Sequence, residues 1–396
     1  MVILSTALRG AIKVLAGMTG YLLLLTLAAF RAPRSTPPRV GAPTSRFLLL
    51  IPAHNEARLL PSMLANLHAL DYPAELYQIH VIADNCEDAT AQIAREAGAV
   101  VHERFNADER GKPYALRWAL AQIWQRGDAH DAVVILDADT VVDANLLRVF
   151  DARLARGERA VQSYYAVRDP ESSWSASLRM VSLAALHFLR PQGRMVLGGS
   201  AGLKGNGMLF AADLLRQHEW PLSLTEDIEY HMALILSGER VTFAPDAVVY
   251  AEMPGSLAAS STQNSRWERG RVEMVRRYVP QLLGKAAERR SFVLFDAAVE
   301  QIIPPFSILV AATGGALLAA LALRRPGLAA SAALLLLVQG LYILAGLVIA
   351  RVPRRVYQAL LYAPVFVAWK VWLYIKVLLG RDHSGWVRTA RNVDDA

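Results

Sequence analysis

Residues 133–140 read Val-Val-Ile-Leu-Asp-Ala-Asp-Thr, in which four apolar side chains lead directly into two carboxylates, Asp137 and Asp139. An apolar, β-branched run of this length predicts a buried parallel strand. Ligands of open α/β sheets bind beyond the carboxyl ends of such strands. We therefore expect Asp137 and Asp139 to lie at a functional edge of a sheet.

The spacing of the two aspartates is compatible with a metal site. Alternate residues of an extended chain share a face, so both carboxylates could converge on one hard cation such as Mg²⁺ or Mn²⁺. These ions prefer oxygen ligands and often share them with substrate phosphates. The alternative is that the two acids are merely the polar start of a loop, and the pair alone leaves both interpretations open.

The residues before this strand predict an α/β domain. Three further strands are expected from apolar runs at 47–52, 78–83 and 100–103, and helices follow them, reaching Leu70, covering 88–97 and reaching Gln125. Strand and helix alternate, which predicts a parallel sheet with right-handed crossovers.

Four segments after Thr140 carry further signals. Residues 174–190 place Leu178, Val181, Ala185, Phe188 and Leu189 on one helical side, which suits either a membrane interface or an ordinary core-facing helix. Residues 198–207 are rich in glycine, which permits close backbone approach to a ligand, but no Lys-Ser or Lys-Thr pair completes a P-loop. Two short strands are expected at 240–243 and 247–250, and a helix over about 263–271.

Thr225, Glu226 and Asp227 form an acidic cluster at the start of a predicted helix, with Thr225 as a possible N-cap. Acids in a first helical turn often serve only as partners of the helix dipole. On the helix after residue 263, Trp267 stands between Arg266 and Arg269, an arrangement that an ordinary surface helix also explains.

Long apolar segments predict membrane helices. The chain is 54% hydrophobic, and the candidate spans are 11–30, 300–323, 329–350 and 357–379. Arginines and prolines follow the first span without a clear cleavage site, which favours a retained anchor over a cleaved signal peptide. The last segment contains Pro364, Lys370 and Lys376. Three full spans after a cytosolic domain would place the basic tail, 381–391, outside, so we expect one segment to be re-entrant or interfacial and the tail to be cytosolic.

These signals divide the chain into an N-terminal anchor and linker (1–44), a central domain with interface helices (45–290) and a C-terminal membrane region with a basic tail (291–396). The net charge of +7 suits an anionic membrane surface or a phosphorylated substrate, and no basic helix or aromatic-interleaved patch favours nucleic acid. Cys86 is the single cysteine, which excludes an internal disulfide and a cysteine-rich zinc site.

Four features together resemble the inverting family 2 glycosyltransferases, whose membrane branch includes cellulose, chitin and hyaluronan synthases and ceramide glucosyltransferases. The features are Pro52-Ala53-His54-Asn55-Glu56 with Asp84, the pair Asp137 and Asp139, Thr225-Glu226-Asp227, and Gln263-x-x-Arg266-Trp267. Each is weak alone, but their order over residues 45–270 is typical of the family. The resemblance implies a GT-A fold, an Mg²⁺ or Mn²⁺ cofactor and a nucleotide-sugar donor, with a UDP-sugar favoured.

The resemblance also implies roles for individual residues. Asp227 would be the catalytic base. Donor-binding roles fall to Pro52, Ala53, Glu56, Asp84, Lys112, Asp137, Asp139, Gln263 and Arg266, of which Asp137 and Asp139 would act through the metal. Acceptor-binding roles fall to Glu226, Trp267, Gly205 and Asn206.

The expected function is transfer of a sugar to a lipid-linked or polysaccharide acceptor at the cytosolic face of a bacterial inner membrane. A processive synthase that also exports its polymer, a scaffold or transporter with an inactive transferase domain, and a nucleotidyltransferase are the alternatives. Trp386-Val387-Arg388-Thr389-x-Arg391 resembles a tail motif that could close over the donor site, and a tail that binds anionic lipid explains it equally well.

Overall fold

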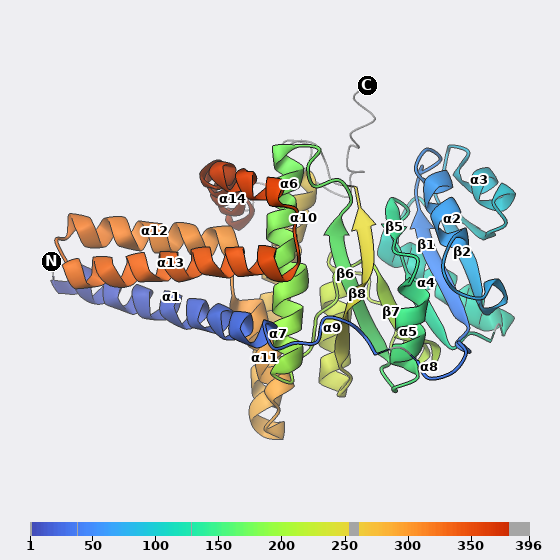
Figure 1. Cartoon of the computed structure of the whole chain (residues 1–396), viewed down its shortest axis with the longest axis horizontal. Helices are drawn as coiled ribbons and strands as arrows, with labels where there is room; N and C mark the ends of the chain where they lie inside the picture. Colours follow the sequence, from blue (N-terminus) through green and yellow to red (C-terminus); the bar gives the residue numbers. More distant parts are fainter. Residues whose placement is uncertain (1, 38, 128, 253–260, 380–396) are drawn as a thin grey trace.

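One sheet organises the α/β domain. The computed structural model describes residues 2–37, 39–127, 129–252 and 261–379, and the tail motif at 386–391 lies outside them. The eight strands have the order β3-β2-β1-β4-β7-β6-β8-β5 (Figure 1). They are β1 (Phe47–Ala53), β2 (Tyr77–Asp84), β3 (Val100–Arg104), β4 (Ala132–Ile135), β5 (Thr140–Val142), β6 (Ala160–Val167), β7 (Met208–Ala211) and β8 (Val241–Ala251).

The parallel sheet predicted from the first four strands is confirmed, and the sheet continues into a second half of mixed direction. Strands β3, β2, β1 and β4 are parallel, as the alternation of strand and helix indicated. Strand β7 is antiparallel to both β4 and β6, and β5 is antiparallel to β8. The reason is that the glycine-rich segment returns the chain to the edge where β4 ends, so β7 starts there and runs the opposite way.

Two local predictions need correction. The strands expected at 240–243 and 247–250 are one strand, β8, whose pairing with β6 shifts register between Ser163 and Tyr164. The helix expected to begin near Glu56 begins only at Leu60, because the preceding residues form a turn in which Asn55 has φ 54°.

Both faces of the sheet are buried, which explains the uninterrupted apolar run of β1. Leu48 and Leu50 point to the face that packs on Leu116, and Leu49 and Ile51 point to the opposite face. The helices of this domain are α2 (Leu60–His68), η1 (Ala74–Leu76), α3 (Thr90–Glu96), α4 (Lys112–Arg126), α5 (Leu146–Leu154), α8 (Ala212–Gln217) and α9 (Glu226–Ser237).

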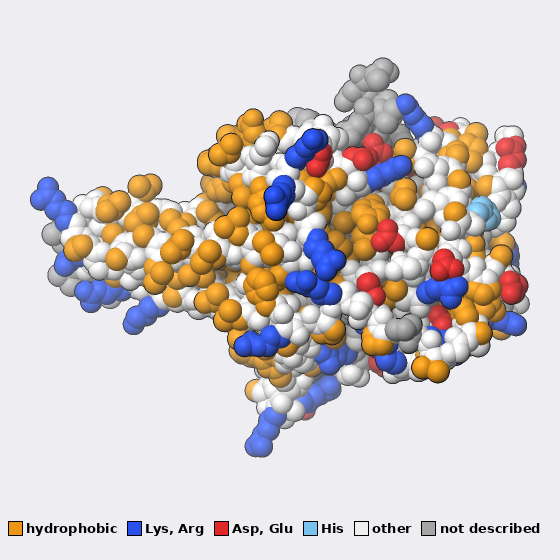
Figure 2. Space-filling view, viewed as in Figure 1, with side chains coloured by type: hydrophobic (Ala, Val, Ile, Leu, Met, Phe, Trp, Pro, Cys, Tyr) orange, Lys and Arg blue, Asp and Glu red, His pale blue; other side chains and the backbone are white. Residues whose placement is uncertain are grey.

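Three apolar helices form a stalk that projects from the domain: α1 (Val2–Ala29), α12 (Phe306–Ala322) and α13 (Pro326–Ile349) (Figure 1). Figure 2 shows hydrophobic side chains over its surface. Within the described residues, three helices are long and apolar enough to cross a membrane, Ile3–Ala29, Pro326–Ile349 and Arg354–Leu378. The predicted span 300–323 is instead broken, since α11 (Phe292–Ile302) and α12 meet at a 66° bend.

Further helices lie at the junction of the stalk and the α/β domain, some of them between the stalk and the sheet (Figure 1). They are α6 (Trp174–Leu183), η2 (Ala184–Leu189), α7 (Arg190–Val196), α10 (Ser261–Arg289), η3 (Arg354–Tyr362) and α14 (Ala363–Leu378). The single apolar stripe predicted for 174–190 is too narrow, because Leu183, off the stripe, is buried as well.

Buried polar contacts fasten the stalk to these helices. Asp296 of α11 accepts hydrogen bonds from Arg194 Nε and Tyr21 Oη, both at 2.7 Å, and so joins α7 to α1. Arg190 donates to the Tyr342 hydroxyl of α13 at 2.8 Å. Buried charges are stable only when paired and hydrogen-bonded, so these contacts fix the orientation of the stalk on the domain.

Candidate active site

The predicted metal-binding carboxylates lie at the carboxyl edge of the parallel half of the sheet. Asp137 and Asp139 follow β4, and both are partly exposed. Lys112, the first residue of α4, donates from Nζ to Asp137 Oδ1 at 2.5 Å and also to the backbone carbonyl of Gly205. The lysine therefore joins the end of β4 to the glycine-rich segment.

Asn206 fixes that segment against β4. Its side-chain oxygen accepts from the Asp137 backbone N–H at 3.1 Å, and its amide donates to Thr140 Oγ1 at 2.9 Å. Gln162 of β6 donates to the Asn206 carbonyl at 2.8 Å and accepts from the Lys204 N–H at 2.8 Å. Asn206 is fully buried, so its side chain positions the loop that carries Gly205.

The acidic start of α9 faces the same loop. A Cβ built on Gly205, whose φ is 79°, would lie 3.5 Å from Asp227 Oδ2. Glycine at this point permits both the left-handed backbone and the close approach of the carboxylate. Three features that are far apart in the sequence, Lys112, Gly205 and Asp227, are thus brought together.

Burial controls the ionisation of the two α9 carboxylates. Burial and the charge of Asp227 raise the pKa of Glu226 to about 8, although Lys112 opposes the shift. Burial also raises the pKa of Asp227, while its own helix backbone, Lys112 and Lys204 act in the opposite direction. A carboxylate whose pKa is raised toward neutrality is a better proton acceptor, which suits a general base.

The expected nucleotide-base residues meet at the ends of β1 and β2. Asp84 is buried and accepts from Arg104 Nη1 at 2.7 Å and from the Asn85 amide at 3.1 Å, both on Oδ1. The His54 Nδ1 lies 2.8 Å from the Asp84 carbonyl. Pro52 and Ala53 end β1, and the buried Glu56 follows in the turn, where its N–H donates to Thr90 at 2.8 Å.

Helix α10 carries Arg266 and Trp267 of the Gln263-x-x-Arg266-Trp267 motif, and it contacts the start of α9. Gly270 packs so closely on Thr225 that an added Cβ would lie 2.3 Å from Thr225 Cγ2. One turn earlier, burial lowers the pKa of Arg266, while the charge of Glu226 raises it. Trp267 is partly exposed. The Arg179 guanidinium lies over its ring, with Arg179 Cζ 5.5 Å from the ring centroid. The Gln263 side chain lies outside the described residues.

The donor set fits a metal that is shared with a substrate. No group of three or more His, Cys, Asp or Glu side chains in the described part of the chain is arranged to hold an ion by itself. Asp137, which pairs with the cationic Lys112, and Asp139, two residues further along the chain, carry the carboxylate oxygens that a metal would use, and a bound substrate would supply further ligands. Mg²⁺ and Mn²⁺ are often bound through few protein carboxylates together with substrate phosphates.

Sequence reasoning missed several residues at this edge. Arg104 ends β3, the strand beside β2, and the rule that strand ends meet at one edge could have placed it next to Asp84. Lys204 lies within the glycine-rich segment 198–207, and the sequence pattern indicated no role for its side chain. Gln162 carried no signal, because strand β6 was not predicted.

Comparisons with known proteins identify the family. The model of the family described as "Glycosyltransferase like family 2" matches residues 43–270, more than half of the chain. The chain belongs to this family. The match contains both carboxylate pairs and ends at Gly270, where α10 contacts α9.

Individual relatives with curated names share about a quarter of their residues with this chain over the matched region. The chain is 27% identical over 267 residues to a beta-monoglucosyldiacylglycerol synthase of Synechocystis, covering 64% of this chain and 54% of the relative. It is 26% identical over 265 residues to a poly-beta-1,6-N-acetyl-D-glucosamine synthase of Staphylococcus aureus, covering 64% and 60%. The match thus spans only about half to three fifths of these relatives.

A solved structure shares the fold. The mannosyltransferase PcManGT of Pyrobaculum calidifontis, in complex with GDP-Man and Mn²⁺, aligns with a TM-score of 0.54 and 21% identity, over 86% of this chain and 98% of that chain. This similarity confirms the expected GT-A-like α/β fold, here with a mixed sheet.

Proposed function

We propose that the protein is an inverting glycosyltransferase that moves a sugar from a nucleotide-diphosphate donor to a lipid-linked or polysaccharide acceptor at the cytosolic face of a membrane. The observation that carries the proposal is the approach of Asp227 to Gly205 and, through Lys112, to Asp137. A base and a phosphate-binding edge are thereby held at one place by three different elements.

The donor would lie along the carboxyl ends of β1, β2 and β4. Asp84, with Pro52, Ala53 and Glu56, would hold the base. Arg104 and Asn85 occupy Asp84 Oδ1, so Oδ2 would accept from a ring N–H, and uracil offers one such group. Guanine carries a ring N–H as well, so this contact suits both a UDP-sugar, which the family resemblance favours, and a GDP-sugar such as the GDP-Man of the solved neighbour.

Cations would hold the diphosphate. Lys112 and Arg266 are the candidate cations, and Asp137 and Asp139 would hold the metal. The donor-binding role expected for Gln263 remains a proposal from the sequence motif. When bound, Mg²⁺ or Mn²⁺ would neutralise charge on the leaving nucleoside diphosphate. Lys112 and Arg266 would act in the same sense, because negative charge grows on that group as the glycosidic bond breaks.

Asp227 would take the proton of the acceptor hydroxyl as its oxygen attacks the anomeric carbon. One in-line displacement without a covalent intermediate inverts that carbon, so an α-linked donor gives a β-linked product. Glu226, whose raised pKa keeps it protonated near neutral pH, would contact the acceptor and support the base. Trp267 would pack on the acceptor and Gly205 would border its site, while Asn206 positions that loop.

The stalk provides a reason for a membrane-bound acceptor. Its outer leucines, such as Leu318, Leu334 and Leu341, are more than half exposed, a pattern that suits lipid. One curated relative is named as a synthase of a glycolipid and another as a synthase of a polysaccharide. We infer a location in a bacterial inner membrane, with the α/β domain in the cytosol.

A donor screen tests the proposal. The purified chain in lipid nanodiscs is incubated with nucleotide sugars, Mg²⁺ or Mn²⁺ and a bacterial lipid extract, and released nucleoside diphosphate is measured. We expect release from at least one UDP-sugar and its loss with EDTA. Pyrophosphate as the product would instead indicate a nucleotidyltransferase, and a ladder of long products would indicate a processive synthase.

A further inference from the structure

Helix α14 has little packing of its own. Leu373 is the one buried side chain of this fully described helix. Val365, Trp372, Ile375 and Leu378 are each about half exposed or more. The helix contacts α10, α12 and η3, and in Figure 1 it lies near the base of the stalk rather than along it. Exposed apolar and aromatic side chains that gather along one helix mark an interaction surface.

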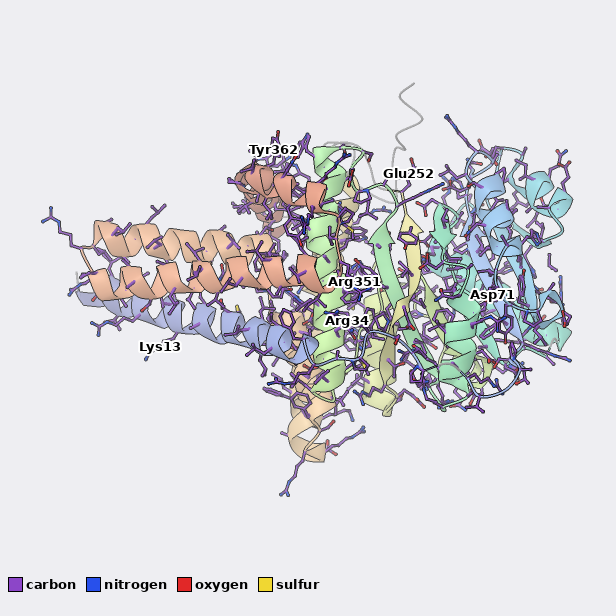
Figure 3. All side chains as sticks on the ribbon, in the orientation of Figure 1. Lys13, Arg34, Asp71, Glu252, Arg351 and Tyr362 are labelled. Atoms are coloured by element: carbon purple, nitrogen blue, oxygen red, sulfur yellow. The ribbon has the colours of Figure 1, made fainter. Side chains whose placement is uncertain are left out.

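The charges around α14 indicate what that partner is. Lys376 lies over the Trp372 ring, 3.4 Å from its centroid, so a cation borders the apolar surface. Arg351, Arg354 and Arg355 are exposed just before it, and Figures 2 and 3 show basic side chains at the base of the stalk, where Arg351 is labelled. Apolar residues flanked by tryptophan and cations are typical of a helix that lies in an anionic lipid surface.

One buried contact joins α14 to α10. Lys370 Nζ donates to Asn264 Oδ1 at 2.7 Å and to Glu268 Oε1 at 3.0 Å. The side chains of Lys370 and Glu268 are only 12% and 9% exposed. A buried ion pair has strict geometry, because either charge left alone would be costly. The position of α14 is therefore tied to that of α10.

The opposite side of α10 faces the proposed site. Asn264 and Glu268 are four residues apart and share one face, and so do Arg266 and Gly270. With 3.6 residues per turn, the two faces are roughly 160° apart around the helix. Gly270 contacts Thr225, directly before the acids of α9. A shift of α10 would move Arg266 and the start of α9 together.

We propose that α14 lies flat in an anionic lipid surface and that the Lys370–Glu268 pair transmits its position through α10 to Arg266 and the base-carrying helix α9. Lys370 is a positioning residue in this scheme, and its effect on turnover rests on the proposed function. The surface selects lipid as the partner, whether or not the site transfers a sugar.

The location of α14 is tested without any activity. Cys86 is the single cysteine, so Ile375→Cys in a Cys86→Ser background carries one environment-sensitive fluorophore. Lipids with a quencher at the headgroup or at the bilayer centre are placed in nanodiscs that contain phosphatidylglycerol. We expect stronger quenching from the headgroup position. Stronger quenching from the centre would make α14 a span, and absence of quenching would leave it in water; either result overturns the proposal.

The coupling is tested by Lys370→Met, with Lys285→Met on α10, outside the proposed lipid surface, as the control that also removes one lysine charge. Turnover is compared in nanodiscs with and without phosphatidylglycerol. We expect wild type and Lys285→Met to be faster with the anionic lipid, and Lys370→Met to lose at least tenfold in kcat together with its lipid response. Lys370→Met with wild-type kcat and lipid response would overturn the coupling.

A charge exchange keeps the test decisive if Lys370→Met does not fold. Lys370→Glu with Glu268→Lys restores an ion pair, whereas each single substitution places like charges together. We expect the double variant to recover most of the activity that the singles lose, and failure to recover in a folded double variant would count against the coupling. If wild type turns over no donor, the proposed function fails, while the quenching result still decides where α14 lies.

Discussion

Asp227 is surrounded by charges of both signs, and this balance is what makes it suitable as a base. Burial disfavours its ionised form, while Lys112 and Lys204 favour it. Glu226 next to it keeps a proton to a higher pH than an exposed glutamate. At neutral pH Glu226 therefore keeps its proton. Asp227 then remains able to take the proton of the acceptor hydroxyl.

Asp227→Asn removes the proposed base but keeps the shape of the side chain. We expect kcat to fall by about 10²–10⁴-fold, the usual contribution of general base catalysis. Donor affinity, measured by titration of the nucleoside diphosphate, should change little. Glu273→Gln, an exposed acid on α10, serves as the control and should keep full turnover.

Lys204→Met tests the electrostatics around the base. Burial lowers the pKa of Lys204 to about 8, and Glu300 and Asp227 oppose that shift only in part, so below pH 8 the lysine is mostly charged. Loss of this cation raises the pKa of Asp227, since the ionised form loses a favourable neighbour. The acidic limb of the kcat/KM profile should move to higher pH by roughly one unit.

The matched variant for this profile is Arg276→Met, which removes an exposed cation of α10. Its acidic limb should coincide with that of the wild type. An unchanged limb in Lys204→Met, or a shift to lower pH, would show that Lys204 does not influence the base.

Individual site residues could be predicted where an apolar strand or a helix start is evident from the local sequence. The strand before Asp137 and the acids at the start of α9 were both predicted from local pattern. The hydrogen bonds of Asn206 and Gln162 could not be predicted, because they depend on how β6 and β7 pair. Their roles follow from tertiary contacts between residues 42 to 69 positions apart in the sequence.

The glycine-rich segment is the element that assembles the site. Gly198, Gly202, Gly205 and Gly207 all have positive φ, between 65° and 85°, so the segment winds through conformations that other residues adopt only with strain. It ends at β7, whose direction it sets. The alternation of strand and helix in the first half predicted the parallel strands correctly, but it could not reveal this return or the antiparallel strand β7.

Gly207→Ala should destabilise the protein more than Gly198→Ala. Both positions have positive φ, but a Cβ at Gly207 would lie 2.0 Å from Ser163 Oγ, whereas nothing lies within 4 Å at Gly198. Overpacking adds about 1–3 kcal/mol to the conformational strain that both variants share. Thermal unfolding of the two variants measures the difference, and equal Tm values would contradict the tight packing of this loop.

At the scale of the whole molecule, the stalk and the α/β domain form one connected body. Gln339 of α13 donates to Thr19 of α1 at 3.0 Å and to Thr313 of α12 at 2.9 Å, so one buried amide joins the three stalk helices. The apolar segments were readable from composition. The 66° bend between α11 and α12 was not predicted, although Pro304 and Pro305 stand at the break and proline is a readable signal for the end of a helix.

The exposed apolar stalk predicts behaviour in cell fractions. We expect the protein to stay in the membrane pellet after washes with 1 M salt and alkaline carbonate, roughly the conditions under which electrostatic attachment is screened. Detergent should release it. Release by salt alone would mean that basic residues, and not the stalk, hold it on the membrane.

In the proposed mechanism, Asp227 drives a single displacement that inverts the sugar. The anomeric configuration of the product tests this, determined by NMR after incubation of the protein in nanodiscs with the α-linked donor that it turns over. We expect a β-linked product from the wild type and almost none from Asp227→Asn. An α-linked product, or full product formation by Asp227→Asn, would show that Asp227 does not act in this way.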